Sequence, residues 1–145
     1  MFKHVLLPTD GTDLSERTVA KGVEFARIMG ARLTGLYVSM PFQVFALDGV
    51  LVGDSEEEYE RESKAIADKH LATIASAAAQ AGVPCELVRA ASEHPYRPIV
   101  DTAKERGCDV IFMASHGRRG MAALLLGSET TKVLTHTDIP VLVYR

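Results

Sequence analysis

The sequence contains no tryptophan, only two cysteines and no large excess of charge of either sign. Two cysteines are too few for a disulfide framework, and Cys85 and Cys108 form no Cys-x-x-Cys pair, so we interpret both as structural residues of strands. The 16 basic and 19 acidic side chains give a net charge of −3, which disfavours nucleic-acid binding. No apolar run approaches the roughly 18 residues of a membrane span, and no signal-peptide pattern is present, so we expect a cytoplasmic protein.

The five histidines are scattered along the chain, and no metal-ligand spacing links them. We therefore expect no structural metal. A chain of 145 residues with 47% apolar content is typical of one domain with its own core, and we assign residues 1–145 to a single domain.

Short β-prone runs alternate with helical patterns along the chain. Strands are predicted over Lys3 to Pro8, Arg32 to Ser39, Cys85 to Ala90, Cys108 to Ala114 and Ile139 to Tyr144. Helices are predicted over Thr12 to Gly30, Ser55 to Gly82, Pro95 to Arg106 and Gly127 to Thr135. Asp13 is the expected cap of the first helix, and Ser55 with Glu58 that of the second. This alternation favours a doubly wound α/β fold, a parallel sheet between two layers of helices joined by right-handed crossovers.

The connection from Met40 to Gly53 is the exception, because it is long and holds several apolar residues among turn-forming ones. Two interpretations stay open. The segment packs onto its own domain, or it forms a lid or a partner-contacting surface.

Ligands of doubly wound sheets bind beyond the carboxyl ends of the strands, where neighbouring connections leave in opposite directions. After the first strand comes the loop 8–12, Pro-Thr-Asp-Gly-Thr, and after the fourth comes the loop 115–120, Ser-His-Gly-Arg-Arg-Gly. The second loop leads to Gly127 and Ser128 at a helix start. Glycines let a phosphate approach the backbone closely, and a helix N-terminus offers unpaired amides that bind its oxygens. The Ser128 hydroxyl would supply a further hydrogen-bond donor, and Arg118 and Arg119 would supply positive charge nearby. The alternative is that the glycines serve only turns and the helix start.

The loop is neither of the common phosphate-binding fingerprints, which argues against a Walker-type ATPase or a dehydrogenase. Glu129 follows in the first turn of the helix. A carboxylate there stabilises the helix by about 0.3–1 kcal/mol, but it competes with a phosphate for the same amides. Which effect wins stays open at this point. His116 fits the pocket wall better than a catalytic role, because a general base needs an orienting partner that no spacing identifies.

Four segments, taken in order, resemble the universal stress protein family. They are Val5–Thr12, Met113–Gly120, the Leu-Leu-Gly-Ser of residues 125–128, and Ile139–Val143. The resemblance covers essentially the whole chain. It implies a five-stranded sheet in the order 3-2-1-4-5, similar to the adenine nucleotide alpha hydrolases.

In the ATP-binding branch of that family the phosphate loop reads Gly-x2-Gly-x9-Gly-Ser/Thr. Gly117, Gly127 and Ser128 match this pattern, and Ala114 stands at its first glycine. The resemblance implies that Pro8, Thr9 and Asp10 face the ribose and phosphates, and that the Val38 backbone faces adenine. It assigns the rest of the nucleotide site to Ala114, His116, Gly117, Arg118, Arg119, Gly127, Ser128, Glu129 and Thr130.

The function implied is binding of ATP, with or without Mg²⁺, or of AMP or ADP, as a regulatory ligand in a stress response. Two alternatives stay open. One is a nucleotide-free dimeric module that acts through protein partners, which Ala114 and Glu129 favour. The other is a slow ATPase or nucleotidyl transferase, for which only Asp10 and His116 are candidates and for which the His-x-Gly-His element is missing. The apolar last strand, Ile139 to Tyr144, is expected at a sheet edge, where family members dimerise, so we expect a homodimer.

Overall fold

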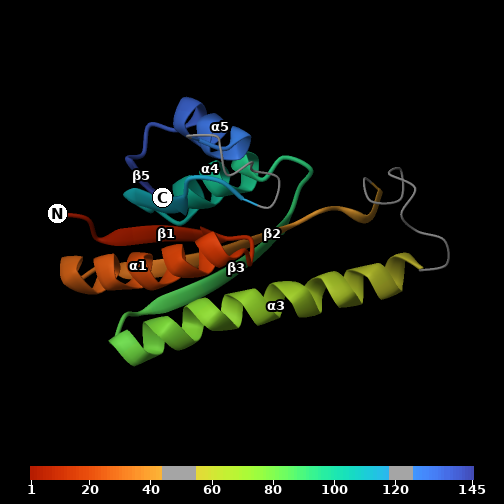
Figure 1. Cartoon of the computed structure of the whole chain (residues 1–145), viewed down its shortest axis with the longest axis horizontal. Coiled ribbons are helices and arrows are strands. Elements are labelled where there is room, and N and C mark those ends of the chain that lie inside the picture. Colours follow the sequence, from red (N-terminus) through yellow and green to blue (C-terminus); the bar gives the residue numbers. More distant parts are fainter. Residues whose placement is uncertain (44–54, 118–125) are drawn as a thin grey trace.

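The computed structural model describes residues 1–43, 55–117 and 126–145. Strands and helices alternate as predicted (Figure 1). The strands are β1 (His4–Thr9), β2 (Arg32–Ser39), β3 (Cys85–Ala91), β4 (Val110–Ala114) and β5 (Val141–Tyr144). The helices are α1 (Asp13–Met29), α3 (Glu56–Ala81), α4 (Tyr96–Glu105) and α5 (Ser128–His136). All four strand pairings are parallel and the order is β3-β2-β1-β4-β5, which confirms the predicted doubly wound sheet.

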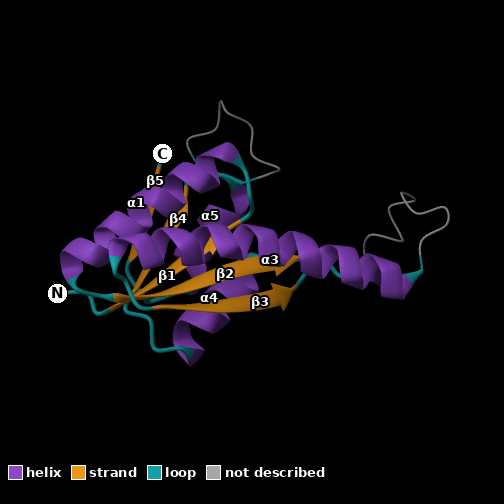
Figure 2. Cartoon of the chain, turned by 90° about the horizontal axis from the view of Figure 1, so that it is seen from below, coloured by secondary structure: helices purple, strands orange, loops and turns teal. Residues whose placement is uncertain are grey.

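Helices cover both faces of the sheet (Figure 2). The helices α1 and α3 lie on one face, and α4 and α5 on the other. Alternate residues of β1 supply the two cores, because successive side chains of a strand point to opposite faces. Leu7 packs in the core with α1 and α3, whereas Leu6 packs in the core with α4 and α5. Both leucines are completely buried, and β1 is the middle strand of the sheet order.

The structure confirms one of the two predicted helix N-caps and corrects the other. Ser55 forms the predicted capping box with Glu58. The cap of α1, however, is Thr12 rather than Asp13, because the Thr12 side chain accepts a hydrogen bond from the amide of Ser15. Asp13 instead lies in the first turn, where a carboxylate favours the helix dipole.

The strands β4 and β5 begin two residues later than predicted, because the backbone before each has other partners. The amide of Cys108 donates to the carbonyl of Ala103 and so closes the end of α4. The amide of Ile139 donates to the Thr137 hydroxyl. As a result β4 starts two residues after Cys108, which is buried but lies outside the strand.

The carboxyl ends of β1 and β4 are not paired with each other. Pairing of β1 with β2 continues to Thr9, whereas its pairing with β4 is restricted to Val5 and Leu6. Pro8 lies beyond these two residues and has no amide hydrogen to donate. The chain then leaves β1 toward α1 on one face and β4 toward α5 on the other. This is the switch point at which ligands bind in folds of this type.

The long connection after β2 is described only as far as Gln43, and residues 44–54 lie outside the described residues. Its first residues pack against α3. The Tyr59 hydroxyl donates to the Met40 carbonyl at 2.7 Å, and the rings of Phe42 and Tyr59 are 5.5 Å apart. These contacts favour the packing interpretation for this part of the connection. In the described ranges, no helix combines the length and the apolar character that a membrane crossing requires.

Candidate functional site

The turn after β1 is held by a small network of hydroxyl groups. The buried hydroxyls of Thr9 and Ser15 are 2.8 Å apart, and the Asp10 amide donates to the Ser15 hydroxyl at 3.1 Å. Asp10 Oδ1 accepts from both the amide and the hydroxyl of Thr12, at 3.0 and 2.7 Å. The Asp10 carboxylate is therefore fixed at the start of α1. Sequence reasoning did not include Thr12 and Ser15 among the site residues, although a threonine directly before a helical pattern was the available signal for the cap.

The structure brings Asp10 of the first loop against Gly117 of the second. A Cβ atom placed on Gly117 would overlap Asp10 Oδ2. Gly117 has no positive φ, so the backbone does not require glycine there. What requires glycine is the space that the Asp10 carboxylate occupies.

Gly127 also lies in close contact with the second loop. A Cβ atom on Gly127 would lie 3.0 Å from Cα of His116 and 3.3 Å from the Ser115 carbonyl oxygen. The amide of Gly127 donates to that same carbonyl at 2.7 Å. Gly127 therefore brings the helix start close to the loop, but its own N–H group already has an acceptor within the protein.

The amides without a partner among the described residues lie one residue further on, in the first turn of α5. The first amide with an acceptor inside the helix is that of Thr131, which donates to the Gly127 carbonyl at 3.0 Å. The amides of Ser128, Glu129 and Thr130 precede it, and in the described ranges no hydrogen bond from them is found. Three N–H groups with the positive end of the helix dipole form an anion-binding arrangement.

Thr130 fastens this helix end to β4. Its hydroxyl donates to the carbonyls of Ala114 and Ser115, at 3.1 and 3.0 Å, and its side chain is buried. The predicted contribution of Thr130 to a ligand is therefore restricted to its backbone amide.

The Glu129 carboxylate points to α4 and not to the start of its own helix. Its Oε2 atom accepts from the amide of Tyr96 at 2.9 Å, and its Oε1 atom accepts from Lys132 Nζ at 2.9 Å. Tyr96 begins α4, and Pro95 before it provides no side-chain cap. Glu129 thus caps the neighbouring helix. The competition with a phosphate that the sequence left open is decided here by the direction of this side chain.

Ala114, which stands at the first glycine of the family pattern, ends β4 and pairs with Tyr144. No residue other than glycine has a positive φ in the part of the chain that the structure describes. Alanine therefore causes no backbone strain at this position, and the only change from glycine is one methyl group. Val38 lies near the carboxyl end of β2 with its side chain in the core, so only its backbone can face a ligand.

His116 follows Ser115 directly, and its Nδ1 atom lies 3.0 Å from the Ser115 hydroxyl. No carboxylate that could orient the imidazole as a general base contacts it among the described residues. The predicted residues Arg118 and Arg119 lie outside the described residues, and their contribution stays a prediction.

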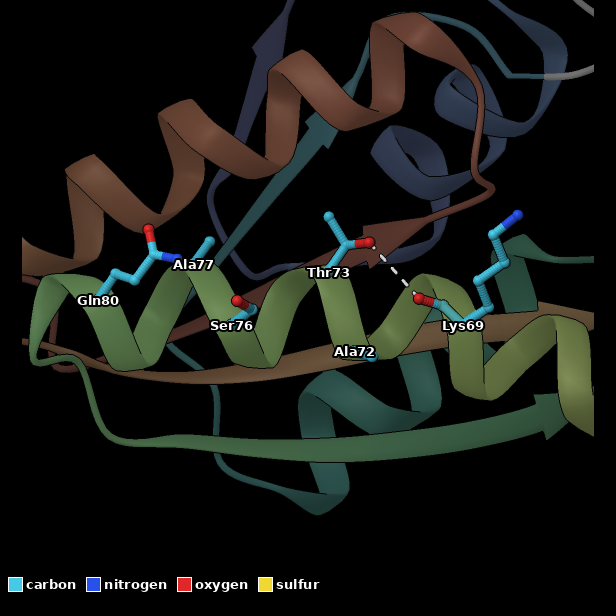
Figure 3. A pocket seen from close by; sticks show the side chains of 6 residues that line it. All are labelled: Lys69, Ala72, Thr73, Ser76, Ala77 and Gln80. Carbon is cyan, nitrogen blue, oxygen red and sulfur yellow. Dashed lines mark hydrogen bonds between the residues drawn. The ribbon is translucent and has the colours of Figure 1, made fainter.

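Two shallow hollows lie away from these loops. One, of about 500 Å³, follows the surface of α3 and is lined by Lys69, Ala72, Thr73, Ser76, Ala77 and Gln80 (Figure 3). The other, of about 420 Å³, lies at the amino ends of the strands and includes Lys3, Arg27 and Arg32. Neither contains a predicted site residue.

A five-stranded parallel sheet with an acidic turn and a helix N-terminus at its switch point defines a doubly wound α/β protein. Comparison with known proteins gives the family. The model of the Universal stress protein family matches residues 1–145, and the chain belongs to that family.

Individual relatives match over the full length. Universal stress protein YxiE of Bacillus subtilis is 32% identical, with 100% of both chains covered. The structure of MJ0577, from Methanocaldococcus jannaschii, superimposes with a TM-score of 0.82 at 25% identity and covers 99% of this chain and 95% of that one. The universal stress protein of Archaeoglobus fulgidus in complex with dAMP superimposes with a TM-score of 0.69 at 20% identity, over 100% of this chain and 98% of that one.

Proposed function

We propose that this protein binds an adenine nucleotide, ATP with or without Mg²⁺ or its mono- or diphosphate, as a regulatory ligand. The observation that carries the proposal is the contact of Asp10 with Gly117 near the first-turn amides of α5, which have no partner among the described residues. A carboxylate suits the hydroxyl groups of a ribose, and the amides suit a phosphate. The relative from Archaeoglobus fulgidus, solved with dAMP, supports adenine as the base.

Within the proposed site, each group has one task. Asp10 binds the ribose, and the amides of Ser128, Glu129 and Thr130 bind phosphate oxygens. The Val38 backbone faces the adenine edge. Because Gly117 has no side chain, it leaves space for the Asp10 carboxylate to contact a ligand. Because Glu129 is held by α4, its charge does not occupy the amides that the phosphate needs.

Regulatory binding fits this site better than rapid hydrolysis. The one histidine among the proposed site residues, His116, has its Nδ1 atom beside the hydroxyl of Ser115, and a general base needs an orienting partner such as a carboxylate, which no described residue supplies. A water molecule would have to be activated by Asp10, whose Oδ1 atom already accepts two hydrogen bonds.

The assembly that we propose is a homodimer formed through β5. This strand is the last in the sheet order, and its four residues are all partly exposed. Antiparallel pairing of β5 with β5 of a second copy, about a two-fold axis, would give the backbone N–H and C=O groups of both sheet edges hydrogen-bond partners. The mass in solution, measured by light scattering at micromolar concentration, is expected to be twice that of the chain. A monomeric mass contradicts the dimer and leaves nucleotide binding untouched.

Isothermal titration with ATP and Mg²⁺ tests the proposed ligand. We expect saturable heat in the wild-type protein and its loss in Gly117→Val, since the larger side chain displaces Asp10 and fills the approach. Ala72→Val, on the exposed surface of α3, is the matched control and is expected to bind normally. Absence of heat at high nucleotide concentration in the wild type contradicts the proposal and favours a module that acts through protein partners. Product formation over hours that Asp10→Ala abolishes while affinity persists supports an enzyme instead.

A further inference from the structure

The turn that carries Asp10 is packed against a histidine from another element. Gly11 has a φ of +78°, and a Cβ atom placed on it would overlap Cε1 and Nε2 of His70 and lie 2.7 Å from its Nδ1 atom. His70 belongs to α3, and its ring is half-buried. The face of the imidazole ring therefore fills the space that a side chain at position 11 would take.

The same ring contacts the end of β2. The imidazole of His70 stacks on Tyr37 with 5.5 Å between ring centroids and 12° between ring planes. Tyr37 pairs with Thr9 across the sheet and precedes Val38. His70 thus joins the acidic turn to the strand end that faces adenine in the proposed site.

We propose that His70 is a positioning residue for nucleotide binding, which fixes the Asp10–Gly11 turn through the flat face of its ring. The inference rests on the proposed function. Glycine is the residue with the greatest backbone freedom, so a ring that packs against Gly11 restrains the turn. The hydrogen bonds of Asp10 to Thr12 act within the turn, whereas His70 connects the turn to α3 and Tyr37. Removing the ring frees the Asp10 carboxylate to leave its place in front of Gly117.

The shape of the ring, and not its nitrogen atoms, is what this role requires. His70→Phe keeps a flat ring that stacks on Tyr37, and His70→Ala removes it. Thr73→Ala is the matched control, since Thr73 lies on α3 less than one turn away, is exposed, and bonds only to the Lys69 carbonyl of its own helix among the described residues. ATP affinity is measured for these three variants and the wild type, together with the free energy of unfolding in urea.

We expect His70→Ala to bind ATP about tenfold more weakly, which corresponds to about 1.4 kcal/mol. His70→Phe is expected to bind within about threefold of the wild type, and Thr73→Ala to be unchanged. Equal affinity of His70→Ala and the wild type overturns the proposal. So does a His70→Phe variant that is as weak as His70→Ala, because a direct contact from an imidazole nitrogen would then explain the loss.

Amide hydrogen exchange in the nucleotide-free protein tests the positioning role without relying on the ligand. The Gly11 amide donates to Thr9 Oγ1 at 3.3 Å and the Thr12 amide to Asp10 Oδ1 at 3.0 Å, so both report on the turn. We expect faster exchange of both amides in His70→Ala and not in Thr73→Ala. Unchanged exchange overturns the positioning role. If exchange accelerates but the wild type binds no ATP, the proposed function fails while the role of His70 in the turn stands.

Discussion

Asp10 and Gly117 are in contact across the switch point of the sheet, although they lie in loops that follow different strands. Gly117 has no positive φ, so the contact depends on space alone. The carboxylate that the proposed nucleotide requires therefore keeps its place only while position 117 lacks a side chain.

The first prediction concerns this contact. In Gly117→Ala the new methyl group displaces the end of the Asp10 side chain, which can rotate away, so the free energy of unfolding is expected to change by less than about 1 kcal/mol. ATP affinity is expected to fall about tenfold. In an Asp10→Ala background the same substitution is expected to have little further effect, because the group that it displaces is gone. Additive losses in this double-mutant cycle would show that the two residues act independently.

The second prediction concerns the cap that α5 supplies to α4. Glu129→Ala removes the acceptor of the Tyr96 amide and is expected to lower the free energy of unfolding by about 0.5–2 kcal/mol, as loss of a helix cap does. Glu129→Gln keeps an acceptor oxygen and is expected to lose less. Urea denaturation measures both. If the two variants are equally stable, the cap does not operate as the structure indicates.

The third prediction concerns pH and the buried histidine of β1. The Nε2 atom of His4 lies 2.7 Å from the Thr34 hydroxyl, which donates to Glu86. The imidazole therefore donates through Nε2–H in its neutral form. Burial lowers the pKa of His4 below its usual value, the charge of Arg32 lowers it further, and Glu86 and Asp109 oppose this.

A lowered pKa in the folded state means that the unfolded chain binds the proton more tightly. The contribution of His4 to stability is therefore fully present above the pKa of histidine in the unfolded chain. It is lost as the pH falls from that value through the lowered pKa of His4 in the folded protein. Wild-type stability is expected to fall more steeply than that of His4→Gln between about pH 7 and about pH 5. Urea denaturation across this range measures the difference, and parallel curves would contradict the prediction.

The fourth prediction concerns the two thiols. Burial raises the pKa of Cys108 to about 11 and also raises the pKa of the half-buried Cys85. Since only the thiolate reacts, Cys108 is expected to resist a disulfide reagent in the native protein at pH 8, about three units below its pKa, and to react on unfolding. Cys85→Ser isolates the Cys108 signal. Rapid reaction of that variant in the native state would contradict the burial of Cys108.

Much of the fold could be predicted from the sequence because its signals are local. Glycines 30 and 82 end α1 and α3 in the left-handed conformation, and the alternation of strands with helices determines a parallel sheet. The errors were local as well. Asp13 and Thr12 both have capping side chains, and only the hydrogen bond of Thr12 to Ser15 shows which one caps α1.

The site could be predicted only as a set of loops. That the carboxyl ends of β1 and β4 meet follows from the fold, but which side chains touch there does not. The Glu129 carboxylate could have turned to its own helix, and it bonds instead to Tyr96, 33 positions earlier in the chain. The contact of His70 with Gly11 gave no signal, because it depends on how α3 packs across the sheet.

A crystal structure of the protein grown with excess ATP tests the central claim most directly. The account predicts a nucleotide at the switch point, with its ribose on Asp10 and its phosphates on the amides of residues 128–130. A nucleotide bound elsewhere, or protein side chains that fill this corner in the presence of excess ATP, would contradict it.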